Sequence, residues 1–128
     1  ASGTHGNEPQ TAAAIFELEA LFGADAQHSD AACEFVRTLL EANEQDIAQL
    51  RELWWGARWS ELGELAHRLA GVAAVICAQR VEASCRALQG LCEEREGDAS
   101  FDAAVEAVEV ALGELQAGLR QWLAQAQG

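Results

Sequence analysis

One histidine, in the stretch ELAHRLAGVAAVI (residues 64–76), has a position suited to nucleophilic chemistry. The apolar residues around it recur at helical spacing and predict an inward face made of Leu62, Leu65, Leu69, Val72 and Ile76. His67 lies two residues from both Leu65 and Leu69, so it points about 200° away from either one. A neutral imidazole is a good nucleophile near pH 7 and can carry a phosphoryl group as a labile phosphoramidate. The spacing therefore predicts a solvent-exposed nucleophile, and the competing interpretation is an ordinary solvated histidine.

Four small residues lie one or two helical turns from His67, namely Gly63, Ala70, Gly71 and Ala74. A glycine inside a helix costs about 1 kcal/mol relative to alanine, so two of them need a reason. Small residues around an imidazole would leave a bare surface that a second protein could approach closely. We expect this surface to be a docking face.

The docking face must be positioned by helices, and the sequence predicts helices along most of the chain. Three- and four-residue apolar spacing predicts helices over about 11–23, 30–55, 58–77, 79–94 and 98–124. Ser29 or Asp30 can cap the second helix, and Gly56 is expected to provide a left-handed cap after it. Because the connections are short, the fold class predicted is all-α, an antiparallel up-down-up-down four-helix bundle with an additional short N-terminal helix.

Composition narrows the possible partners. A chain of 128 residues suggests one domain, with residues 1–10 (which include His5) as a linker or cloning-derived segment and 11–128 as the bundle. The net charge of −13, with eight arginines and no lysine, argues against nucleic acid and anionic membranes as partners. No apolar run approaches the roughly 18 residues of a membrane span. The four cysteines are predicted to be reduced, buried residues, which suits the cytoplasm: Cys33, Cys77, Cys85 and Cys92.

At this point the sequence resembles the histidine-containing phosphotransfer (HPt) domains of multistep phosphorelays. Those domains show a pattern close to W-x(7)-H-x-L-K-G-S-A-x-x-x-G-A, followed by a helix with a cysteine and a leucine. The matching residues here are Trp59, Ala66, His67, Leu69, Gly71, Ala73, Ala74, Ile76 and Ala78, then Val81, Cys85 and Leu88. The match is sharp over residues 59–92 and extends in helical layout over about 30–125.

The resemblance implies that His67 accepts a phosphoryl group from a receiver-domain aspartate and passes it to another receiver. It implies no metal or cofactor in this domain, Mg²⁺ supplied by the receiver, and no autokinase activity. It also implies a cytoplasmic module of a membrane-anchored hybrid sensor kinase. The linker-like start and a final helix that ends in AQAQG suggest that this module is C-terminal. The receiver is expected to dock on Gly63, Glu64, Ala74, Leu21, Phe22 and Phe35, and the phosphoryl group to lie near Arg68, Ala70 and Gly71.

The chain departs from the family pattern at three positions. Ala70 replaces a lysine that can help to hold the phosphoryl group, while Val72 and Cys77 replace a small polar residue and a glycine. Arg68 is one candidate for the missing cation, and neighbouring helices offer Arg51, Arg58, Arg80 or Arg86. The alternative is a pseudo-HPt adapter that binds proteins without carrying phosphate. A metal-binding bundle is disfavoured because the Glu64–His67 spacing has no second copy.

Overall fold

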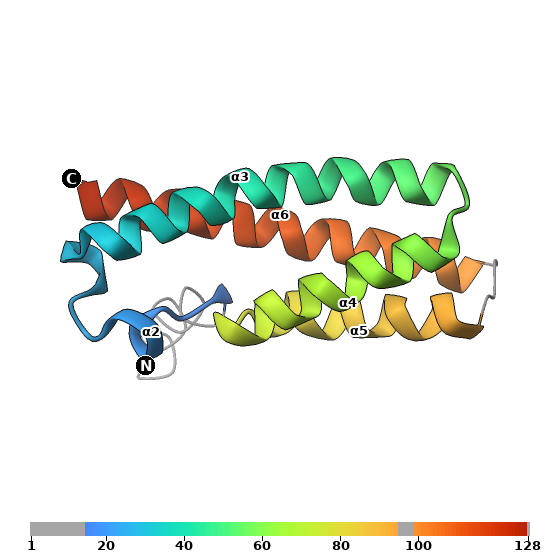
Figure 1. Ribbon diagram of the computed structural model, residues 1–128, viewed down its shortest axis with the longest axis horizontal. Coiled ribbons are helices and arrows are strands. Elements are labelled where there is room, and N and C mark those ends of the chain that lie inside the picture. Colours follow the sequence, from blue (N-terminus) through green and yellow to red (C-terminus); the bar gives the residue numbers. More distant parts are fainter. Residues whose placement is uncertain (1–14, 95–98, 128) are drawn as a thin grey trace, which may run out of the picture.

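The protein is an elongated bundle of four long helices (Figure 1), seen in a computed structural model that describes residues 15–94 and 99–127. Its elements are α2 (Glu19–Phe22), a 3-10 turn η1 (Ala26–His28), α3 (Asp30–Trp55), α4 (Trp59–Val75), α5 (Gln79–Glu94) and α6 (Ala99–Gln127). Consecutive long helices run antiparallel and contact each other, and α6 closes the bundle against α3. The predicted fold is confirmed. Residues 1–10, predicted to be a linker, lie outside the described residues.

The N-terminal helix is shorter than predicted. Residues 16–18 are not helical, and α2 supplies only four residues of the expected 11–23 helix, whose first part lies outside the described residues. The reason is that Phe16 and Leu18 are both buried, a two-residue alternation that an extended segment satisfies and a helix does not. The intervening Glu17 N–H donates to the Ile76 carbonyl at 2.7 Å, which ties this segment to the end of α4.

At the two ends of α3, the predicted cap at Ser29 is confirmed and the predicted left-handed cap at Gly56 is wrong. The Ser29 hydroxyl accepts a hydrogen bond from the Ala32 N–H at 3.2 Å and so caps α3. After α3, however, Gly56 has a φ of −84°, and the left-handed residue is Ala57, with a φ of 53°. Cys77, after α4, also has a positive φ of 57°. That conformation explains why the family pattern has a glycine at this position, since a β-carbon there costs about 1 kcal/mol.

The core follows the predicted faces closely on α5 and α6. On α5 the four predicted positions are buried, Val81, Cys85, Leu88 and Cys92. On α6 the buried residues include Phe101, Val105, Val108, Leu112, Leu115 and Leu119. Cys33 and Cys77 are only half-buried, and all four cysteines are free thiols. Burial raises the pKa of Cys85 to about 12 and that of Cys92 to about 11.

A few polar groups interrupt the apolar core at its middle. The Asn43 amide donates to Gln116 Oε1 at 2.8 Å and to the Leu112 carbonyl at 3.1 Å. One turn further along α3, the buried Asp46 accepts a hydrogen bond from Arg68 of α4. These bonds satisfy groups that would otherwise be costly to bury, and they link α3 to both of its neighbours. Within the part of the chain that the structure describes, no helix is long and apolar enough to cross a membrane.

Candidate functional site

The His67 imidazole lies exposed in the middle of α4. The leucines on either side of it, Leu65 and Leu69, are 3% and 5% exposed, so the helix turns the histidine away from the core as the spacing predicts. No residue of 15–94 or 99–127 forms a hydrogen bond or an ion pair with the ring. Both ring nitrogens are therefore open to a partner from solution.

Two of the small residues near His67, Gly63 and Ala70, lie on the packed side of α4. Ala70 has no exposed surface, and a β-carbon at Gly63 would lie 3.2 Å from the Cys92 β-carbon. Both residues lie on the side of α4 that carries the buried Ala66 and Ala73, so their small size serves close packing between the two helices. The expectation that Ala70 lies on the open face beside His67 is thereby corrected. Gly63 likewise adjoins α5 more than it adjoins solvent.

The open face of α4 is formed by the residues on the other side of His67. Gly71 and Ala74 are exposed, and a β-carbon at Gly71 would meet nothing within 4 Å. Glu64 is also exposed, one turn before the histidine. At Gly71, one turn after the histidine, no side chain covers the helix surface beside the imidazole.

Two valines continue this face, and the sequence reasoning missed both. Val72 was predicted to point inward but is 40% exposed, and Val75 is 55% exposed. Val75 follows His67 by eight residues, which places it about 80° round the helix on the same half of its surface. That spacing is the signal that could have identified it. We call the exposed residues Glu64, His67, Gly71, Val72, Ala74 and Val75 the α4 face.

The segment before α3 supplies the other expected docking residues. Leu21 on α2 is 46% exposed, whereas Phe22 and Phe35 are half-buried and pack against each other in a tilted arrangement, with ring centroids 5.4 Å apart and planes at 53°. The two rings therefore join α2 to α3. Leu21 is the side chain that remains available at this end of the bundle, where the Glu17–Ile76 hydrogen bond anchors the segment.

Among the arginines, Arg68 is the one that extends from α4 itself. Its Nη2 donates to Asp46 Oδ1 at 2.9 Å, while the arginine side chain stays 53% exposed. The four other candidate cations pair with carboxylates elsewhere: Arg51 with Glu109, Arg58 with Glu61, Arg80 with Glu114 and Arg86 with Glu82. Arg68 is thus the arginine best placed beside the histidine.

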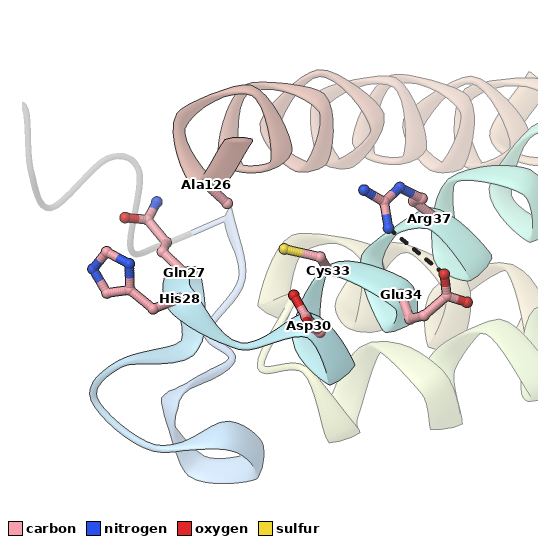
Figure 2. Close-up of a pocket in the computed structure, with 7 residues that line it drawn as sticks. All are labelled: Gln27, His28, Asp30, Cys33, Glu34, Arg37 and Ala126. Atoms are coloured by element: carbon pink, nitrogen blue, oxygen red, sulfur yellow. Dashed lines mark ion pairs between the residues drawn. The ribbon is translucent and has the colours of Figure 1, made fainter. Parts of the chain in front are cut away.

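A hollow at one end of the bundle is separate from His67 (Figure 2). Its lining comes from η1, the start of α3 and the end of α6: Gln27, His28, Asp30, Cys33, Glu34, Arg37 and Ala126. Arg37 and Glu34 lie one turn apart on α3 and pair with each other at 3.6 Å. Across the described ranges, no three His, Cys, Asp or Glu side chains gather as a metal site, and Glu64 and His67 form no part of one.

Comparison with known proteins identifies the family of the chain. The family model described as Hpt domain matches residues 34–127. The chain is 28% identical over 126 residues to the virulence sensor protein BvgS of Bordetella bronchiseptica, covering 98% of this chain and 10% of that protein. It is 33% identical over 95 residues to BvgS of Bordetella pertussis, covering 70% of this chain and 8% of that protein.

The chain thus spans about a tenth of the length of the curated relatives it matches. No solved structure matches it significantly. The family match includes α4, α5 and α6 in full and most of α3, so it covers His67 and every long helix that positions it. The chain belongs to the Hpt domain family of phosphotransfer domains.

Proposed function

We propose that His67 is the phosphoacceptor of this Hpt domain and exchanges phosphoryl groups with the aspartates of two receiver domains. The observation that supports this most strongly is the exposed imidazole on α4, with both nitrogens open and an unobstructed turn beside it. A carrier needs a nucleophile that two different partners can reach in succession, and this geometry offers one.

In the proposed step, Nε2 of neutral His67 attacks the phosphorus of an aspartyl phosphate in line with the bond to the leaving carboxylate oxygen. The new P–N bond forms as that P–O bond breaks, and the aspartate leaves as a carboxylate. The imidazole keeps its proton on Nδ1, so no separate base is required. The receiver supplies Mg²⁺, which neutralises charge on the transferring group.

The α4 face and Leu21 would form the surface on which the receiver docks. Val72, Val75 and Leu21 offer exposed apolar area, and Gly71 and Ala74 allow close approach to the imidazole. Close approach matters because the reacting atoms must come within about 3–3.5 Å of each other in the correct orientation. The exposed Glu64 would lie at the edge of this surface.

The larger protein is inferred from the relatives. We infer that this domain works in the cytoplasm as a module of a sensor kinase, in support of which the relatives carry the name sensor protein and the four cysteines are free thiols. Such a module would receive its phosphoryl group and would not need to phosphorylate itself.

The relay is tested with a receiver domain carrying labelled phosphate on its aspartate. We expect label to move onto this domain, to be acid-labile and base-stable there, and to leave again when a second, unlabelled receiver is added. If competent receivers from the same signalling system transfer no label to the folded domain, the relay proposal is wrong. Stable receiver binding in that case would favour the adapter function, with the missing lysine at Ala70 as its cause.

A further inference from the structure

The ion pair between Arg68 and Asp46 joins the phosphoacceptor helix to the core of the bundle. Arg68 follows His67 directly on α4, and its Nη2 donates to Asp46 Oδ1 on α3 at 2.9 Å. We propose that Asp46 sets how tightly His67 retains its phosphoryl group, by competing for the Arg68 guanidinium. This inference rests on the proposed phosphoacceptor role of His67.

The two partners of this pair differ in their access to solvent. The Asp46 side chain is 11% exposed, whereas that of Arg68 is 53% exposed. A nearly buried carboxylate requires a cation, because an unpaired buried charge is strongly destabilising. The Arg68 guanidinium depends less on Asp46, because water can solvate the exposed part of its charge. The Arg68 guanidinium is thus held by Asp46 through Nη2, while the rest of the group is exposed to solvent.

The guanidinium has donors left for a second anion. It carries five N–H groups in a rigid fork, and within residues 15–94 and 99–127 only its Nη2 has a partner. A phosphorylated imidazole adds about two negative charges and three strong acceptor oxygens next to it along the helix. Arg68 can therefore bind the phosphoryl group, and the Asp46 carboxylate weakens that binding because it partly neutralises the guanidinium charge.

The composition of the chain makes this arginine important. The chain has no lysine, so the cation that the family pattern has at position 70 is absent. Position 70 is also fully buried, and Arg51, Arg80 and Arg86 engage carboxylates on or between other helices. Arg58, before α4, likewise pairs with Glu61. Arg68 lies within α4 and adjoins His67 in sequence, so it is the candidate cation for the phosphohistidine, and Asp46 already partly neutralises its charge.

The test measures how label divides at equilibrium between the domain and a receiver that phosphorylates it. We expect Arg68→Gln to shift the label about three- to tenfold toward the receiver, and Asp46→Asn to shift it by a similar factor toward His67. In the double variant, Asp46→Asn should have no effect beyond that of Arg68→Gln, since Asp46 acts through Arg68.

This measurement separates the proposal from two simpler roles. Partition between free proteins does not depend on how well they dock, so a purely docking role for Arg68 would change the exchange rate and leave the partition unaltered. A purely structural pair would lower the stability in both variants without opposite shifts. The matched controls are Arg51→Gln and Glu109→Gln, which break an ion pair between α3 and α6 with the same changes in net charge.

Shifts in the same direction, or no shift, in the two folded single variants would overturn the inference while leaving the phosphoacceptor role of His67 intact. Failure of every receiver to label the wild-type domain would overturn both. If Asp46→Asn does not fold, Arg68→Lys replaces it. A lysine keeps the charge without the fork, so the label should divide between the wild-type and Arg68→Gln values, and a value equal to that of the wild type would contradict the proposal.

Discussion

Replacing Gly71 with leucine is expected to slow phosphoryl transfer about 100-fold while leaving the bundle folded. Gly71 lies one turn beyond His67 on the α4 face, and a β-carbon there meets nothing within 4 Å. The leucine therefore fits the domain without strain, and it removes a helix-interior glycine, which should raise the free energy of unfolding by about 0.5–1 kcal/mol. Its side chain would, however, occupy the space through which a receiver approaches the imidazole.

The matched control is Gly113→Leu on α6. Gly113 is also exposed within a long helix and also has open space at its β-position, so the gain in stability should be similar. Transfer rates in this variant should equal those of the wild type. Stopped-flow or quenched-flow transfer from a labelled receiver, together with urea unfolding, measures both quantities. Normal transfer in folded Gly71→Leu would show that the receiver does not approach His67 along this turn.

Alkaline solution is expected to destabilise the domain through two thiols. Burial raises the pKa of Cys85 from its ordinary value of 9.0 to about 12 and that of Cys92 to about 11. Above pH 9 the unfolded chain releases these two protons and the folded chain retains them, so the stability falls as the pH rises. The expected loss of unfolding free energy between pH 9 and pH 11 is about 4 kcal/mol.

The composition makes this titration unusually simple to interpret. The chain contains no lysine and no tyrosine, so no other buried side-chain type ionises in this window. Urea unfolding followed by tryptophan fluorescence under reducing conditions would give the pH profile. The double variant Cys85→Ala with Cys92→Ala should be less stable at pH 7 and should show a much flatter alkaline slope. An equally steep slope in that variant would rule out the two thiols as its origin.

The positions that face the core or point directly away from it could be predicted from the sequence. The exposed His67 and the four buried positions of α5 follow from the 3.6-residue period alone, because they lie at the centres of polar or apolar faces. The N-cap at Ser29 is equally local, since it depends only on a hydroxyl three residues before an unpaired N–H.

The flanks of α4 could not be predicted in this way. Gly63 packs against α5 and Ala70 is buried while Gly71 and Ala74 face solvent, although all four are small and within two turns of His67. Whether a small residue is buried depends on which flank of α4 packs against α5. The apolar period of α4 alone does not predict that flank. Val72 was misassigned for the same reason, because its apolar side chain fits either the core or a docking surface.

The remaining differences arise from competing local and tertiary demands. The segment at Phe16 and Leu18 fits a helical apolar pattern but buries both residues better as extended chain paired with Ile76. The left-handed residue after α3 is Ala57 although glycine precedes it. The Arg68–Asp46 pair joins residues 22 positions apart, a contact that only the assembled bundle reveals.

The most direct measurement of the central claim assigns the phosphoryl group among the three histidines of the chain, His5, His28 and His67. Two variants are labelled by the same receiver: one with His5→Gln and His28→Gln, which retains His67 alone, and one with His67→Gln, which retains the other two. The phosphoacceptor role of His67 predicts acid-labile label approaching one group per chain in the first variant and none in the second. Label on folded His67→Gln, or none on the variant that retains His67, would contradict it.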